Sequence, residues 1–87
     1  MPYIVEILRT AVRSLEHIQQ ADRKRIAAKI DTLADDPRPP GVKKLEAADD
    51  LYRVRVGDFR VIYRIDDARK TITVAVIRRR ADAYRSR

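Results

Sequence analysis

The first part of the chain has apolar residues at a helical period, after an opening segment typical of a β-strand. Residues 3–8 are mostly β-branched or aromatic, which favours extended structure. The apolar positions of the two helices predicted next are Val12, Leu15 and Ile18, and then Ile26, Ile30, Leu33 and Ala34. Thr10 and Asp22 are expected to cap these helices at their N-termini. Asp36 ends the second helix, because a residue before proline avoids the α region.

From Leu51 onward apolar and polar residues alternate, which predicts strands. The predicted strands are 51–56, 59–65 and 71–77, with 42–45 as a possible short edge strand. Gly57-Asp58 is typical of a type II′ hairpin turn, and a four-residue turn is expected after the middle strand. The order β-α-α-β-β-β with a short C-terminal tail predicts an α+β fold, an antiparallel sheet packed on an N-terminal helical hairpin. We expect residues 1–87 to form one domain.

The glycine-first turn determines which side chains face each other across the hairpin. The predicted apolar pairs, which must meet the helices, are Val56 with Phe59, Val54 with Val61, and Tyr52 with Tyr63. On the other face Arg55 lies across from Arg60, with Arg53 and Arg64 nearby. We call this the arginine face. A slip of one residue would bury the arginines and expose the valines, so the register is well specified.

The last strand is expected to follow the same alternation. This alternation assigns Ile72, Val74 and Val76 to the core face, and Thr71, Thr73 and Ala75 to the arginine face. Antiparallel order carries the end of this strand back toward Arg60. Arg78, Arg79, Arg80 and Tyr84 can therefore converge on the arginine face, where Tyr84 could ionise, stack on a base, or simply pin the tail to the sheet.

Positive charge is concentrated in the C-terminal part of the chain. Residues 1–52 hold nine Lys/Arg and nine Asp/Glu, whereas residues 53–87 hold eleven and four, which accounts for the whole net charge of +7. This indicates a polyanionic partner, first of all a nucleic acid, with a solubilising surface as the alternative. Two directly opposed arginines repel by up to about 1 kcal/mol. A bound phosphate would relieve that repulsion, unless the two side chains turn apart into water.

The composition argues against several other kinds of chemistry. There is no cysteine, and the single histidine, His17, lies off the apolar stripe and is expected at the surface. Adjacent aspartate pairs lie at helix ends and turns without histidine or cysteine at ligand spacing, so we expect no metal and no other cofactor. The N-terminus lacks a signal-peptide layout, and no apolar run reaches about 18 residues, so we expect a cytoplasmic protein without a membrane partner.

Two segments resemble RelE-type toxins of the RelE/ParE superfamily. Residues 51–67 resemble the central hairpin of these toxins and residues 76–85 their C-terminal signature, and the likeness covers essentially the whole chain. It implies a toxin of a type II toxin–antitoxin system, a metal-independent endoribonuclease (an mRNA interferase). Such a toxin cleaves mRNA through attack of the 2′-hydroxyl, usually in the ribosomal A site. The implied partners are mRNA, the ribosome and a cognate antitoxin.

The resemblance also implies roles for individual residues. Arg60 would stabilise the phosphorane, Arg79 would position the phosphate or support the leaving group, and Tyr84 would act as the base or stack on a base. Arg78 and Arg80 are alternatives for the late catalytic arginine. Arg53 and Arg55 would hold flanking phosphates. The residues expected to bind RNA are Arg53, Arg55, Arg64, Arg78 and Arg80. Two other functions remain open, a ParE-like toxin that poisons DNA gyrase on the same fold and a non-catalytic nucleic-acid-binding module.

Overall fold

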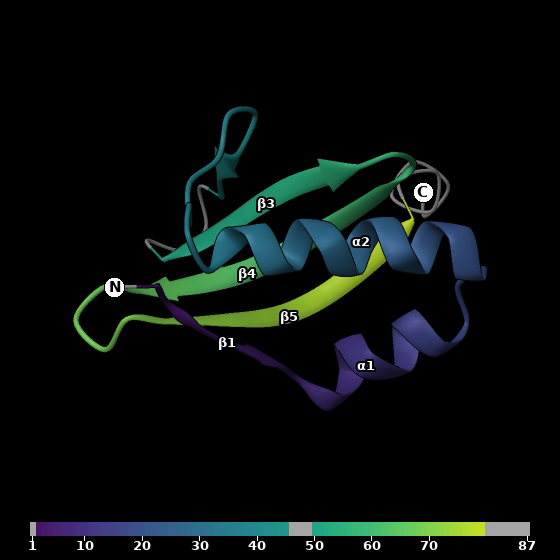
Figure 1. Ribbon diagram of the computed structural model, residues 1–87, viewed down its shortest axis with the longest axis horizontal. Helices are drawn as coiled ribbons and strands as arrows, with labels where there is room; N and C mark the ends of the chain where they lie inside the picture. The colour runs from purple at the N-terminus through teal and green to yellow at the C-terminus, as the bar shows by residue number, and fades with distance from the viewer. Residues whose placement is uncertain (1, 46–49, 80–87) are drawn as a thin grey trace.

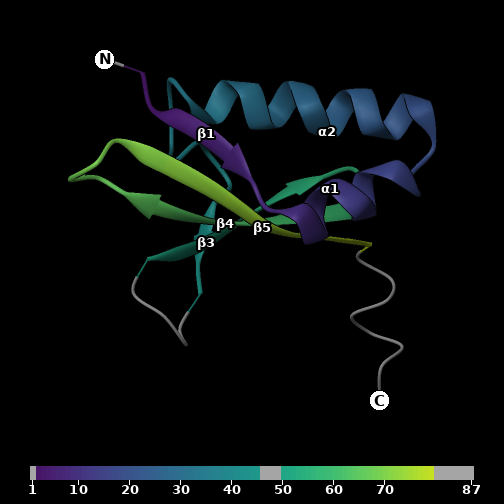
Figure 2. The same cartoon turned by 90° about the horizontal axis from the view of Figure 1, so that it is seen from below.

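In the computed structural model, which describes residues 2–45 and 50–79, two helices cover one face of a five-stranded sheet (Figures 1 and 2). The elements are β1 (Ile4–Ile7), α1 (Arg9–Glu16), α2 (Gln20–Leu33), β2 (Lys43–Lys44), β3 (Leu51–Val56), β4 (Phe59–Asp66) and β5 (Thr71–Arg79). Across the sheet the strands are ordered β1-β5-β4-β3-β2. The predicted α+β class, element order and helical hairpin are confirmed.

The sheet is mixed rather than wholly antiparallel. Strands β2 to β5 pair antiparallel as predicted, but β1 pairs parallel with β5. The prediction of an antiparallel sheet was therefore wrong for β1. No short turn links β1 to β5, because the helical hairpin and three strands lie between them in the chain. Such a long connection is what a parallel pair of strands requires. The backbone N–H of Ile4 donates to the carbonyl of Lys70 at 2.8 Å, which fixes the start of β1 beside the β4–β5 turn.

The core lies between the sheet and α2, where the apolar pattern placed it. The largest fully buried side chains are Tyr63, Ile26, Leu33, Ile72, Val61 and Val74. In α1 the buried stripe differs from the predicted one. Ala11 is fully buried and Leu15 and Ile18 pack against the core, whereas Val12 is 39% exposed. Ala11, Leu15 and Ile18 are spaced by four and then three residues, so Ala11 rather than Val12 lies on the side of this short helix that faces the core.

Both helices begin before the predicted caps. Their N-cap residues are Leu8 and Gln19, and neither side chain makes a capping hydrogen bond. Asp22 lies in the first turn of α2, where a carboxylate still stabilises the positive end of the helix dipole. The hydroxyl of Thr10 donates instead to the carbonyl of Ala75 in β5, at 3.1 Å. Thr10 therefore makes a tertiary contact with the sheet instead of the predicted cap.

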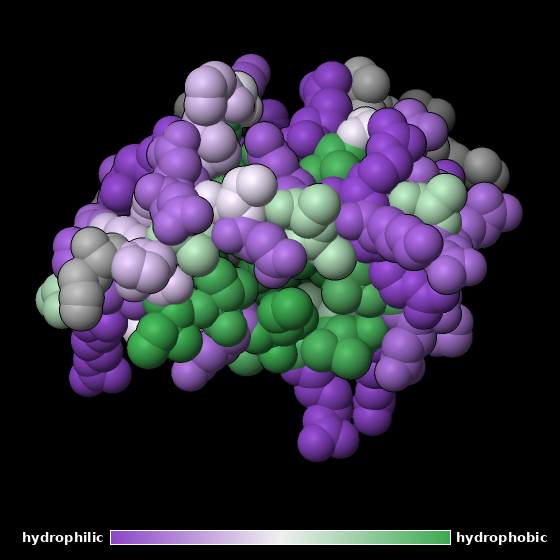
Figure 3. Space-filling view, in the orientation of Figure 1, coloured by the Kyte–Doolittle hydropathy of each residue, from purple (hydrophilic) through white to green (hydrophobic). Residues whose placement is uncertain are grey.

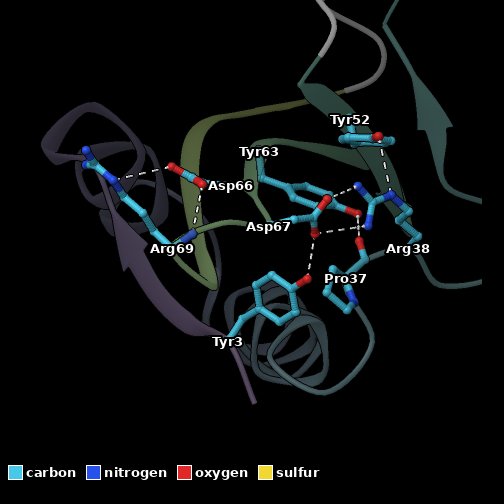
Figure 4. A network of polar contacts seen from close by, with 8 residues as sticks. All are labelled: Tyr3, Pro37, Arg38, Tyr52, Tyr63, Asp66, Asp67 and Arg69. Carbon is cyan, nitrogen blue, oxygen red and sulfur yellow. Dashed lines mark hydrogen bonds and ion pairs between the residues drawn. The ribbon is translucent and has the colours of Figure 1, made fainter. Parts of the chain in front are cut away.

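A polar network, the Arg38 network, holds the loop between α2 and β2 against one end of the sheet (Figure 4). The guanidinium of Arg38 donates to both carboxylate oxygens of Asp67, at 3.0 and 3.4 Å, and to the hydroxyl of Tyr52 at 3.3 Å. Asp67 also accepts a hydrogen bond of 2.5 Å from the hydroxyl of Tyr3. The donors, Arg38 first and then Tyr3, hold the pKa of Asp67 below its ordinary value. The network joins the residue before β1, the α2–β2 loop, β3 and the β4–β5 turn.

Replacing Asp67 with asparagine is expected to lower Tm at pH 7 and to have a smaller effect in acid. Because the pKa of Asp67 is lowered in the folded protein, its charge contributes stability above the unfolded pKa of about 3.9, and this contribution is lost as pH falls through the folded value. Thermal unfolding of both proteins from pH 7 to pH 3 measures this. Asp31→Asn, exposed on α2, changes the charge equally and is the control. A Tm difference for Asp67→Asn that is constant over this range would contradict the expectation.

Candidate nucleic-acid interface

The arginine face is the sheet face opposite the helices (Figure 2). The predicted register of β3 and β4 is confirmed at every pair, including Arg55 with Arg60. Gly57 has φ +59, and of the described residues other than glycine only Lys70 has a positive φ, so Asp58 does not. This is the pattern of the type II′ turn. The local turn therefore sets the arginines of both hairpin strands on one side of the sheet.

Strand β5 adds Arg78 to this face, in one row with Arg55 and Arg60. Arg60 lies across from Arg55 on β3 and across from Arg78 on β5. Because neighbouring strands lie about 4.8 Å apart, the backbone positions of the three arginines span about 10 Å. Arg60 is the middle member of this row, so a phosphate above it would be approached by guanidinium groups from three strands.

A bulge in β5 decides which arginine joins the row. The ladder pairs Tyr63 with Val74 but Ile62 with Val76, so Ala75 is an additional residue and the alternation changes phase there. The prediction that Val76 faces the core was therefore wrong. Val76 lies on the arginine face, and Ile77, which is 4% exposed, takes the core position. A signal was present in the sequence, because strict alternation would have placed Ile77 among the arginines.

The bulge also corrects the expected position of Arg79. This residue pairs with Phe59 and therefore lies on the helix face, where its guanidinium carbon is 4.8 Å from the centroid of the Phe59 ring. Of the three consecutive arginines, the structure places Arg78 beside Arg60 and separates Arg79 from it. The predicted positions of Arg80 and Tyr84 lie outside the described residues.

The arginine face contains a hollow of about 260 Å³, the cationic hollow, lined by Gly41, Lys43, Arg53, Arg55 and Arg60. All of its charged lining residues are cations, which are hydrogen-bond donors without an acceptor. Such a surface suits the oxygens of a phosphodiester, and guanidinium groups can bind them bidentately. Sequence reasoning missed Lys43, although the period of two in a strand containing Lys43 and Lys44 assigns one lysine to each face.

Arg64 also lies on the arginine face, but it is engaged by a carboxylate. Its Nε is 2.8 Å from an oxygen of Asp50, and the two side chains are 54% and 47% exposed. An exposed ion pair of this kind contributes little to stability, about 0–1 kcal/mol. It would nevertheless compete with a phosphate, which makes Arg64 a weaker candidate for nucleic-acid binding than the residues of the hollow.

His17 is exposed at the end of α1, as expected, and helps to line a second hollow of about 390 Å³ together with Arg78 and Arg79. Among residues 2–45 and 50–79, no three His, Cys, Asp or Glu side chains are grouped so that they could hold a metal ion. No helix in the same part of the chain is long and apolar enough to cross a membrane.

Known proteins resemble this chain over nearly its whole length. The family profile of the ParE toxin of the type II toxin–antitoxin system parDE matches residues 5–84. Toxin RelE of Mycobacterium tuberculosis is 33% identical over an alignment of 88 positions, which covers 97% of this chain and 88% of that protein. A chain of the archaeal RelE–RelB complex from Pyrococcus horikoshii OT3 superposes with a TM-score of 0.83 at 35% identity, covering 92% of this chain and 97% of that one. For the RelBE2 toxin–antitoxin complex of M. tuberculosis the TM-score is 0.81 at 28% identity, with 92% and 100% covered.

Proposed function

This chain belongs to the RelE/ParE superfamily of type II toxin–antitoxin toxins, and from that premise we propose that it is a metal-independent endoribonuclease that cleaves mRNA in the ribosomal A site. The observation that carries the proposal is the arginine row, in which Arg60 lies between Arg55 and Arg78 next to the cationic hollow. A cluster of like charges on a small domain is explained by an anionic substrate, and a phosphodiester fits the donors available.

Cleavage of RNA through its own 2′-hydroxyl makes three demands. A base must accept the proton of that hydroxyl, positive charge must stabilise the phosphorane, and the leaving 5′-oxygen must gain a proton. Arg60 and Arg78 supply the positive charge from neighbouring strands, already positioned before the substrate arrives. Arg53 and Arg55 hold flanking phosphates. We assign the base to Tyr84, and water supplies the proton to the leaving oxygen, because arginine gives up a proton too reluctantly.

A second candidate function is poisoning of DNA gyrase. The observation that favours it is the matching family profile, which is that of the ParE toxin. A gyrase-binding toxin does not need a phosphodiester held beneath converging guanidinium groups, so the arginine row favours the nuclease. The two functions predict different damage in a cell, because one acts on transcripts and the other on chromosomal DNA.

Sequencing of RNA 5′ ends after induction of the protein tests the proposal. We expect new ends within coding regions of many transcripts, in phase with codons, and no SOS response. An SOS response with intact messages would establish the gyrase function instead. Growth without either change would leave a non-catalytic binding module. Incubating the purified protein with naked RNA and with programmed ribosomes then determines whether cleavage needs the ribosome.

We also propose that an antitoxin covers this protein in the resting cell. Figure 3 shows a continuous apolar area on the helix side of the molecule, where Figure 1 shows β1 and α1. Exposed apolar residues there are Ile7 (38%), Leu8 (46%) and Val12 (39%), which line a common hollow. Apolar areas of this kind mark interaction sites, and β1 is an edge strand with hydrogen-bonding groups to offer. Purification from the native operon should give a complex with a small acidic protein, and a free monomer would contradict this.

A further inference from the structure

The two lysines of the short edge strand β2 lie on opposite faces of the sheet. Lys43 pairs with Arg53 and therefore lies on the arginine face, whereas Lys44 pairs with Tyr52 and lies on the helix face. Lys43 lines the cationic hollow, and Lys44 does not. Adjacent residues of the same chemical type are thus separated by the pleat of the strand.

The backbone that carries Lys43 is held on both sides. Before β2, the carbonyl of Pro37 accepts a hydrogen bond of 2.7 Å from the buried hydroxyl of Tyr63, and the next residue is fixed by the Arg38 network. Gly41 then turns the chain with φ +88, in the left-handed region that favours glycine. After β2, the N–H of Leu45 donates to the carbonyl of Leu51 at 2.9 Å. Lys43 therefore projects from a positioned strand.

The cations of the arginine face form a path that crosses the strands. Arg78, Arg60 and Arg55 lie opposite one another on β5, β4 and β3. Two residues earlier on β3, Arg53 lies opposite Lys43 on β2. The path covers three interstrand spacings of about 4.8 Å each. A polyanion lying across the strands would meet a cation on each of them, whereas one lying along β4 would reach the Arg64–Asp50 ion pair.

We propose that Lys43 binds a phosphate of the RNA that flanks the cleaved bond, and that the RNA crosses the sheet from β5 toward β2. This inference rests on the proposed function. Lys43 contributes a point charge to the phosphate and reads no base, so it strengthens binding equally for all sequences. The Arg38 network acts at a distance, by positioning the strand from which Lys43 projects.

The salt dependence of RNA binding tests this assignment, with Lys44→Ala as the matched control for Lys43→Ala. The probe is a single-stranded RNA with 2′-O-methyl riboses, which binds but cannot be cleaved through its 2′-oxygen. For Lys43→Ala we expect an affinity several-fold lower, and a slope of log K against log salt that is smaller by about 0.7, the value for one phosphate contact to a single strand. Lys44→Ala removes the same charge from the neighbouring residue and should keep the wild-type slope.

The outcomes separate this inference from the proposed function. Equal slopes for the two lysine variants, both folded by circular dichroism, would overturn the role of Lys43. Cleavage of mRNA on programmed ribosomes tests the site itself. If the wild type does not cleave mRNA there, or if Arg60→Ala cleaves it as fast as the wild type, then the nuclease proposal fails and the role of Lys43 fails with it. If the wild type cleaves mRNA but shows no salt-dependent binding of the RNA probe, the role of Lys43 alone is overturned.

Discussion

Arg60→Ala is expected to abolish growth arrest and to lower the rate of RNA cleavage by about 100- to 1,000-fold, the usual cost of losing one positioned donor to the transition state. Arg60 is flanked by Arg55 and Arg78, so no other side chain of the row occupies the middle position. The fold should survive, since removing the central charge relieves repulsion between opposed arginines, which amounts to up to about 1 kcal/mol. Cleavage rates on programmed ribosomes and growth at matched expression measure the two effects.

Two further variants distinguish the specific contribution of the Arg60 guanidinium from the effect of positive charge alone. Arg60→Lys keeps the charge but loses the planar fork that binds two phosphate oxygens, so its activity should fall between those of the wild type and the alanine variant. Arg23→Ala removes an exposed arginine on the opposite layer, in α2, and should remain toxic. If Arg60→Ala still arrests growth at equal expression while Arg23→Ala behaves in the same way, the assignment of Arg60 is wrong.

Arg78→Ala is expected to lose about 100-fold in cleavage rate, whereas Arg79→Ala should stay close to the wild type. The reason is the bulge at Ala75, which places Arg78 beside Arg60 and turns Arg79 toward Phe59. Single-turnover cleavage by the two variants, which differ from the wild type by the same side-chain change, measures the contrast directly. No control variant at a distant site is needed, because each of the two variants loses the same charge and therefore serves as the control for the other.

The two variants should also differ in stability, and in the opposite sense. Arg79→Ala loses a contact with the Phe59 ring, which at an exposed site is worth about 0.5–1 kcal/mol, so its Tm should be lower. Arg78→Ala should unfold near the wild-type temperature. If Arg79→Ala were the inactive variant and Arg78→Ala the active one, Arg79 would regain the catalytic role that the family resemblance suggested, and the register at the end of β5 would not describe the working enzyme.

Local signals in the sequence were sufficient to predict the arrangement of the arginines at the centre of the site. Gly57-Asp58 joins β3 and β4 directly, so the turn alone determines that Arg55 and Arg60 oppose each other. The alternation of apolar residues then determines which face is buried, because the reverse choice would place arginines in the core. Lys43 was missed because, although the two lysines of β2 must lie on opposite faces, so short a strand does not indicate which of them lies on the arginine face.

By itself the sequence determined the element order, the helical hairpin, the hairpin register and the side of the sheet on which the arginines gather. These features depend on turns and periodicities within a few residues. The tertiary structure alone decided the parallel pairing of β1, the position of Lys43 and the choice of Arg78 over Arg79. The bulge that brings Arg78 beside Arg60 lies where the element next to β5 changes from β1 to α1. There the hydroxyl of Thr10 donates a hydrogen bond to the carbonyl of Ala75, which follows it by 65 residues in the chain. Contacts between such distant segments cannot be assigned from local periodicity, because each depends on packing that forms only when the layers meet. Ile77 indicated that the alternation in β5 changes phase, but not at which residue.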